Sequence, residues 1–304
     1  RFKCDWSSDV CSSDLTVTTA NPEKWHEYLA KWLMGVAANA LGDVGCQNHT
    51  CLVLTGEQGK FKTTWLDNLC PPSLKSYLFT GKIDPQNKDV LTMIAEYLLI
   101  NIDDQLKALN KRDENELKNL ITTPAVKYRR PYDVYIEEYP HLASFMASVN
   151  GNDFLTDPTG SRRFLPFEVV KIDIEAAEKI NMDNVFSEIM WLLDNGYRYW
   201  FVDDEITELH MVSQQFHVQT VEYELLMQGF EKPEESEDCF MTTAQILGYL
   251  QAYTTIRLIE KRMSEALHKA GFDRVSKRLN KSENPVYCYR IKKIKPNPFF
   301  DRDL

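Results

Sequence analysis

The stretch GEQGKFKT, residues 56–63, decides the fold because it joins an apolar strand to the start of a helix. The strand before it is CLVL, residues 51–54, and helical spacing follows over residues 62–69. A glycine-containing turn in this context that ends in Lys-Thr is typical of a phosphate-binding loop, in which backbone N–H groups face the phosphates. We therefore expect Lys62 to reach the β- and γ-phosphates and Thr63 to offer its hydroxyl to Mg²⁺.

One residue departs from this pattern, since Phe61 stands where glycine is expected. A bulky side chain rarely tolerates a positive φ, so we expect position 61 to keep an ordinary backbone conformation. The alternative is a strand–turn–helix with incidental lysines. The residues predicted to contact ATP are Gly56, Glu57, Gln58, Gly59, Lys60, Phe61, Lys62, Thr63 and Thr64.

A second apolar strand, residues 98–102, ends in the paired carboxylates of Asp103 and Asp104. Carboxylates at the carboxyl edge of a sheet can supply a Mg²⁺ ligand and a group that activates water. We assign Asp103 to Mg²⁺ and Asp104 to water activation. Acidic residues also end many strands without a function, which is the competing interpretation.

Two further strand-end motifs fit phosphoryl transfer. Asn150 follows the apolar run 143–149, and an amide there can position the attacking water, although asparagine is also a common turn residue. Arg162 and Arg163 lie between a turn and the strand 164–170. An arginine supplied by a neighbouring subunit would stabilise charge on the transferring phosphoryl group. The competing interpretation of this pair is surface salt bridging.

Cations interleaved with aromatic residues indicate contacts with nucleic acid. The loop KYRRPY, residues 127–132, could follow a phosphate backbone and stack bases, or could be a solvated loop. Residues 257–295 carry 12 Lys or Arg against 4 Asp or Glu, in a chain whose net charge is −10. The candidate DNA contacts are Lys127, Arg129, Arg130, Lys261, Arg262, Lys269, Arg274, Lys277 and Arg278.

The order of the predicted elements defines the fold class. Strands alternate with helical patterns, which predicts an α/β core with a mainly parallel sheet. The predicted order of two helices and a β-ribbon after residue 239 suits a winged helix. The alternative to DNA binding is a winged helix that makes only protein contacts. The expected segments are 1–15, not native to the protein; 16–48, N-terminal helical; 49–200, ATPase core; 201–238, helical connection and acidic linker; 239–304, basic winged helix.

Composition limits the cellular compartment and the classes of protein that we expect. Seven cysteines without a dense pattern fit reduced thiols in a cytoplasm, and no apolar run is long enough for a membrane span. The net charge excludes a globally basic nucleic-acid coat. The repeated SSDV and SSDL of residues 7–15 resemble translated sequencing adaptor, so we expect the natural chain to begin differently and an upstream domain to be missing.

The order GEQGKFKTTWL, INIDDQL, KYRRPYD and SVNGNDFLTDPTGSRRFLPFEV resembles the virulence-associated E family over residues 50–170. That family is similar to superfamily-3 helicases and to plasmid and phage primase-helicases. The resemblance implies a three-layer, AAA+-like P-loop core. It makes Asn150 the sensor, Arg162 or Arg163 the arginine finger, and Lys127 with Arg129 part of a DNA-facing hairpin.

The resulting hypothesis is an ATP- and Mg²⁺-dependent DNA helicase or translocase of a mobile-element or phage replication system. It would work as a ring, a hexamer by family likeness, with DNA and a possible separate primase as partners. Two alternatives remain: a non-catalytic DNA-binding protein with a decayed loop, and a nucleotide-gated switch that does not unwind DNA.

Overall fold

The chain forms two compact units, residues 1–218 and 219–304. The computed structural model describes residues 16–42, 45–130, 132–155, 161–217, 220–234, 239–278 and 285–294. The segment 1–15, the turn at 159–160 and the acidic end of the expected linker, 235–238, lie outside the described residues. No helix in these ranges is both long and apolar enough to cross a membrane.

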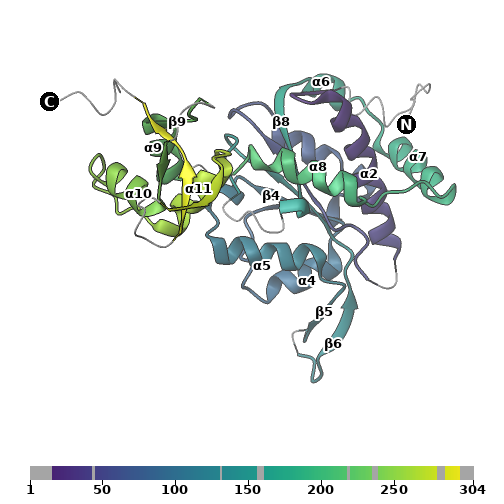
Figure 1. Ribbon diagram of the computed structural model, residues 1–304. Helices are drawn as coiled ribbons and strands as arrows, with labels where there is room; N and C mark the ends of the chain where they lie inside the picture. Colours follow the sequence, from purple (N-terminus) through teal and green to yellow (C-terminus); the bar gives the residue numbers. More distant parts are fainter. Residues whose placement is uncertain are drawn as a thin grey trace. The chain divides into compact units, whose positions relative to one another are not determined.

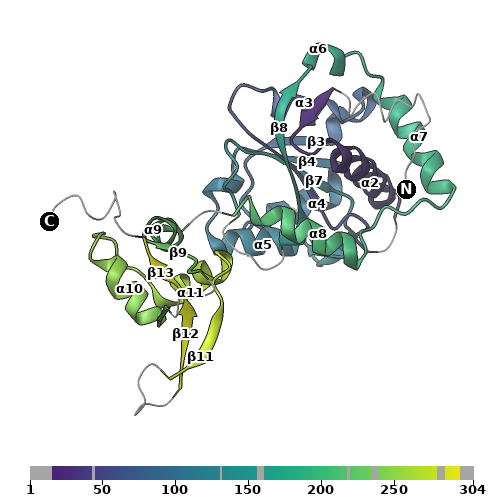
Figure 2. The same cartoon turned by 45° about the horizontal axis from the view of Figure 1, so that its top comes forward.

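A six-stranded sheet in the order β1-β8-β2-β7-β4-β3 forms the centre of the first unit (Figures 1 and 2). Only β1 is antiparallel to its neighbour, so the prediction of an α/β core with a mainly parallel sheet is confirmed. The strands are β1 (Val17–Thr19), β2 (Cys51–Thr55), β3 (Leu78–Gly81), β4 (Leu99–Asp103), β7 (Ser144–Ser148) and β8 (Phe164–Ile172).

Helices cover both faces of this sheet. Alternate residues of β2 point to opposite faces: Leu52 and Leu54 join the core under α2, α3 and α7, whereas Cys51 and Val53 join the core under α4 and α5. The helices are α2 (Pro22–Leu41), α3 (Lys62–Asn68), α4 (Asp89–Glu96), α5 (Lys111–Thr122), α6 (Ile174–Ala177), α7 (Met182–Asp194) and α8 (Asp203–Gln214). Short 3₁₀ turns lie at Pro72–Tyr77, Leu106–Ala108 and Ser161–Arg163.

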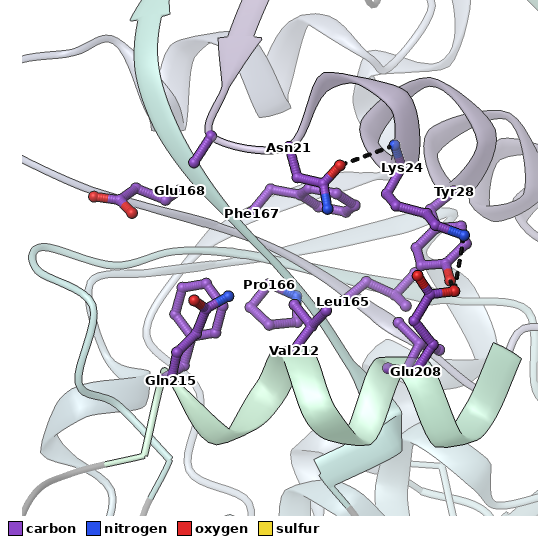
Figure 3. Close-up of a pocket in the computed structure, with 13 residues that line it drawn as sticks. Asn21, Lys24, Tyr28, Leu165, Pro166, Phe167, Glu168, Glu208, Val212 and Gln215 are labelled. Atoms are coloured by element: carbon purple, nitrogen blue, oxygen red, sulfur yellow. Dashed lines mark hydrogen bonds and ion pairs between the residues drawn. The ribbon is translucent and has the colours of Figure 1, made fainter.

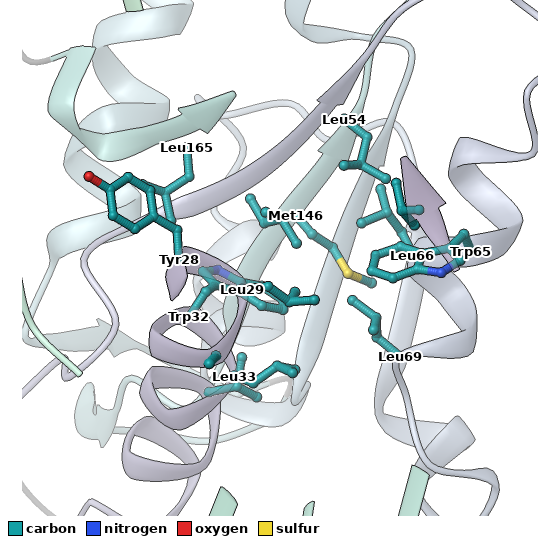
Figure 4. Close-up of a cluster of buried hydrophobic side chains, with 14 of the residues drawn as sticks. Tyr28, Leu29, Trp32, Leu33, Leu54, Trp65, Leu66, Leu69, Met146 and Leu165 are labelled. Atoms are coloured by element: carbon teal, nitrogen blue, oxygen red, sulfur yellow. The ribbon is translucent and has the colours of Figure 1, made fainter. Parts of the chain in front are cut away.

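Helix α2 belongs to this core and is not a separate N-terminal segment. It begins as predicted, with Pro22 in the first turn and the Asn21 side chain accepting from the backbone of Lys24. Its aromatic and leucine side chains pack on the sheet (Figure 4), and the Trp32 indole donates to the Thr50 carbonyl at 3.2 Å. Because β1 also joins the sheet, the expected segment 16–48 is part of the same unit as the core.

A two-stranded hairpin, β5 (Ala125–Tyr128) and β6 (Glu137–Pro140), projects from the first unit (Figure 1). The residues between its strands carry large apolar side chains that are exposed. They are Tyr132, Val134, Tyr135 and Ile136.

The second unit begins earlier than the sequence predicted. Helix α9 (Val221–Gly229), expected within the connection 201–238, contributes the buried Leu226 to the same core as α10 (Thr243–Gln251) and α11 (Glu260–Lys269). The expected boundary at 239 is therefore wrong by about one helix. A three-stranded sheet completes the unit in the order β10 (Phe240–Met241), β12 (Val286–Arg290) and β11 (Arg274–Lys277), and β9 (Phe230–Glu231) pairs with β13 (Lys292–Lys293).

Candidate functional site

Three neighbouring strands bring the predicted residues to one edge of the sheet. β7 lies between β2 and β4, and Ser148 is the register partner of both Leu54 and Asp103. All three strands are parallel, so their carboxyl ends are level. The loop that follows β2 therefore lies beside the ends of β4 and β7.

A hydroxyl–carboxylate cluster forms at this edge. The hydroxyls of Thr63 and Ser148 each donate to Asp103 Oδ1 at 2.8 Å, and the two hydroxyl oxygens are 3.1 Å apart. Hydroxyl and carboxylate oxygens are the hard ligands that Mg²⁺ prefers, and Mg²⁺ commonly uses only one or two carboxylates. The donor set of Thr63 and Asp103 therefore fits a magnesium ion.

Lys62 is held close to this cluster. Its ammonium donates to the carbonyls of Gly56 and Glu57, at 3.2 and 2.6 Å, and to Asn150 Oδ1 at 3.3 Å. The residue is only 5% exposed. Desolvation by burial lowers the pKa of Lys62, while the nearby Asp104 carboxylate opposes that shift. The lysine is thus aimed at the loop, with three acceptors for its three N–H groups.

The prediction for Phe61 is wrong. Its φ and ψ are 57° and 22°, in the left-handed region, and its residue is 55% exposed. This conformation lets the chain turn into α3, whose Trp65 N–H donates to the Phe61 carbonyl at 2.9 Å. The position thus has the backbone that glycine provides without strain, although phenylalanine occupies it.

Gly56 is required for a different reason. Its φ is 129°, and a Cβ there would lie 3.0 Å from the Val169 carbonyl oxygen on β8. The loop backbone therefore passes too close to β8 for any side chain at this position.

Asp104 contacts the segment after β7, and that segment contacts the loop. The Asn150 N–H donates to Asp104 Oδ1 at 3.2 Å, and the Gly151 N–H donates to the Gly56 carbonyl at 3.0 Å. Asp104, like Phe61, has a positive φ, of 45°. The structure therefore brings Lys62, Thr63, Asp103, Asp104 and Asn150 together, as the sequence predicted.

The remaining loop residues lie further from this cluster. Lys60 forms an ion pair with Glu57 at 3.2 Å, and Gln58 and Thr64 are exposed. Nothing in these contacts assigns them a role beyond the loop backbone.

The two arginines lie at the opposite edge of the sheet. They precede β8, whose first residue Phe164 is the register partner of Cys51 at the start of β2. The distance along the sheet to Thr55 is four residues, or about 13 Å at ~3.3 Å per residue. Arg162 and Arg163 are therefore not brought to the glycine-containing loop of their own chain. Among the described residues, neither forms a salt bridge that would support the surface-pair interpretation.

The basic hairpin strand is partly neutralised. Lys127 forms an ion pair with its cross-strand partner Glu138 at 2.8 Å, and the Arg130 guanidinium lies 4.7 Å from the Tyr139 ring centre. Arg129 is exposed. The hairpin therefore offers Arg129 and its apolar tip to a partner more readily than Lys127.

In the second unit several predicted contacts stack on aromatic rings. Lys269 lies 5.0 Å from the Tyr223 ring, Arg274 4.2 Å from Tyr287 and Lys277 3.9 Å from Phe240. Burial lowers the pKa of Lys269. The remaining predicted cations, Lys261, Arg262 and Arg278, are exposed.

A small cavity beside β8 is too small for a nucleotide. It has a volume of about 60 Å³ and lies between the start of α2 and α8 (Figure 3). The ion pair of Lys24 and Glu208, at 2.8 Å, stands at its rim. We interpret it as a packing gap at the edge of the sheet.

Comparison with known proteins gives the family. The sequence pattern of the virulence-associated protein E-like domain matches residues 4–219. The chain belongs to that family. The virulence-associated protein E-like match ends where the first compact unit ends, so the second unit lies outside it. No curated protein matches the sequence.

Solved structures share the fold of this virulence-associated protein E-like chain. The apo structure of the NrS-1 C terminal region (305-718) matches with a TM-score of 0.52 and 11% identity, covering 93% of this chain and 75% of that one. An A-form apo structure of the same region gives a TM-score of 0.50 with the same identity and coverage. At this identity the likeness supports the fold and nothing finer.

Ser148 is the site residue of this family member whose role sequence reasoning missed. Its hydroxyl bridges Thr63 and Asp103. The signal was present, because a hydroxyl side chain ends the strand that lies between the loop strand and the carboxylate strand. Recognising it required the strand order, which the sequence alone does not give.

Proposed function

We propose that the chain is a Mg²⁺-dependent ATPase that acts on DNA in the replication of a mobile element or phage. The observation that carries this proposal is the contact of Thr63 with Asp103 directly after the glycine-containing loop. Lys62 would neutralise the β- and γ-phosphates, and Thr63 and Asp103 would hold Mg²⁺. When bound, that ion would offset the charge that develops on the phosphates.

The other site residues fit the transfer of a phosphoryl group to water. The carboxylate of Asp104 would orient the attacking water, and the Asn150 amide would align it. Insertion of β7 between the loop strand and the carboxylate strand supports a P-loop ATPase of the additional-strand type. Catalysis would consist of positioning and electrostatic stabilisation, without a covalent intermediate.

A ring is the assembly that gives the arginines a role. Since Arg162 and Arg163 lie about 13 Å along the sheet from their own loop, an arginine finger would have to serve the ATP of a neighbouring copy. By likeness to superfamily-3 helicases, the ring would be a hexamer, and a separate primase is a possible partner.

DNA contacts would come from the hairpin and the second unit. Exposed aromatic side chains of the hairpin tip suit base stacking, and Arg129 suits a phosphate. The second unit has three helices and a three-stranded antiparallel sheet, which supports a winged helix that starts at α9. The cations on and after α11 would contact the DNA backbone.

The test measures phosphate release by the purified full chain with and without Mg²⁺ and forked DNA. We expect Lys62→Ala to reduce turnover about a hundredfold, as loss of a single charge-stabilising group commonly does. Lys88→Ala is the matched control, because it removes an exposed lysine at the start of α4, outside the loop, and should change turnover little. Absence of Mg²⁺-dependent turnover and of nucleotide uptake in the folded protein would reject the proposal.

A second candidate is a nucleotide-gated switch that does not unwind DNA. Phe61 favours it, since a phenylalanine in the left-handed region strains the loop on which turnover depends. A strand-displacement assay on forked DNA separates the two. ATP turnover that DNA stimulates, without displacement of the strand, would select the switch.

A further inference from the structure

A second cavity lies at the opposite edge of the sheet from the phosphate loop. It has a volume of about 420 Å³. Its walls come from the segment before β2, the 3₁₀ turn before β8 and the segment before α8 with the start of that helix, all in the first unit. It is therefore separate from the cluster of Lys62, Thr63 and Asp103.

The charge of this cavity is unlike that of the chain. Arg162, Arg163 and His49 line it, whereas none of the described lining residues is Asp or Glu. The whole chain has 45 acidic against 35 basic residues, so the cationic character of the described lining is not a reflection of composition. An anion would relieve the repulsion between the two neighbouring guanidiniums.

Arg163 has an unused donor inside the protein. Its Nε is buried and has no hydrogen-bond partner within the described part of the chain. Desolvation lowers the pKa of Arg163, and the adjacent charge of Arg162 lowers it further. A buried donor without an acceptor is costly, and buried cations are normally paired. Two adjacent guanidiniums that have no counter-ion among the described residues are the strongest sign that this cavity takes a ligand with oxyanion groups.

His49 and two aromatic residues complete the cavity. The His49 Nε2 lies 2.8 Å from the Cys46 carbonyl, to which it donates, and this contact fixes the ring at the cavity wall. Tyr199 is fixed by its hydroxyl, which donates to Gln47 Oε1 at 2.8 Å. The Trp200 ring packs edge-on to Tyr199, with ring centres 5.3 Å apart, and the residue is 57% exposed. An exposed indole next to cations suits a planar base.

From these contacts we infer that the cavity is a second nucleotide-binding site, with Arg162 and Arg163 on the phosphates and Trp200 against the base. The volume accommodates a mononucleotide. The arginines match its phosphates, and the indole matches its base. The site lies within one chain, so it and the arginine finger proposed above are alternative roles for the same two side chains. It does not depend on the phosphate loop, so it can exist whether or not the loop hydrolyses ATP.

The test first removes the loop lysine, so that nucleotide binding at the loop is lost. The Lys62→Ala chain is then titrated calorimetrically with ADP and with pyrophosphate, at a dilution at which it is monomeric. We expect one ADP to bind per chain. Adding Arg163→Gln should weaken binding of both probes at least tenfold, because a charge-assisted hydrogen bond is lost. Arg112→Gln, which removes an exposed arginine on α5, is the matched control and should leave both affinities unchanged.

A second variant keeps the inference testable if Arg163→Gln disturbs folding. Trp200→Ala should weaken ADP binding about tenfold and leave pyrophosphate binding unchanged, as expected for loss of base stacking alone. Either no binding to Lys62→Ala, or binding that both variants leave intact, would overturn the inference. A mixing experiment gives the third outcome. If ADP bound only when the Lys62→Ala chain was mixed with a chain that carries Arg163→Gln and an intact loop, the arginines of one chain would serve the nucleotide of its neighbour, and the inference would be overturned.

Discussion

The left-handed conformation of Phe61 predicts that glycine at this position gives a more stable protein than alanine. We compare Phe61→Gly with Phe61→Ala, because both variants lose the same ring and its contacts. A residue with a Cβ costs about 1–2 kcal/mol in the left-handed region, and glycine does not have this cost. Glycine loses about 0.5–1 kcal/mol more than alanine through chain entropy. We therefore expect Phe61→Gly to be the more stable variant, by roughly 0.5–1 kcal/mol.

The neighbouring Thr64 provides a control of opposite sign. Thr64 is exposed in the first turn of α3, where its backbone is helical. There glycine should be less stable than alanine by about 1 kcal/mol. The same pair of substitutions should thus change sign within three residues.

Urea unfolding followed by tryptophan fluorescence measures this difference. All six tryptophans lie between residues 6 and 200, so the signal reports on the first unit alone. If Phe61→Gly were no more stable than Phe61→Ala, the residue would not hold a positive φ. The argument that this loop already has the backbone of a glycine-containing turn would then fail.

Three further predictions concern buried and titrating groups. Asp103→Asn should reduce the Mg²⁺ stimulation of ATP turnover roughly a hundredfold, measured over a magnesium titration, because an amide cannot replace the carboxylate charge. Lys118→Met should destabilise the first unit by about 3–5 kcal/mol in urea, since it breaks the buried ion pair of Lys118 with Glu114, whose charged atoms are 2.7 Å apart; adding Glu114→Gln should recover most of the loss. Burial pushes the pKa of Glu205 upward, but hydrogen bonds from Lys31 and other donors together leave it below its ordinary value of 4.5. Its contribution to stability is therefore complete above pH ~4.5 and is lost as pH falls through the folded-state pKa; Glu205→Gln should flatten acid unfolding curves in that window.

Much of the site could be predicted because parallel strands end at one edge. Asp103 and Asn150 each follow a buried apolar run, and the strand–loop–helix around Lys62 has an unambiguous pattern. Their meeting then follows from the topology of an α/β sheet.

Other features were beyond sequence reasoning for physical reasons. β1 has only three residues at a sheet edge, and the hairpin strand β6 is Glu-Glu-Tyr-Pro, so neither carries the apolar period of a buried strand. Helix α9 follows directly on polar sequence and resembles a linker until its packing partners are known. The conformation of Phe61 went against its residue preference because the surrounding loop fixes it.

Strand β7 connects the hairpin to the site that contains Lys62. It is buried over all five residues, about 17 Å of extended chain, and starts directly after the hairpin. The two ring nitrogens of His141 lie 2.7 and 2.8 Å from the carbonyl oxygens of Thr123 and Ala143 at that junction, and the protonated nitrogen donates to its carbonyl. Just beyond its other end, Asn150 touches Lys62. Because tightly packed interiors have low compressibility, a shift of β7 along its axis would displace the base of the hairpin and the Asn150–Lys62 contact together.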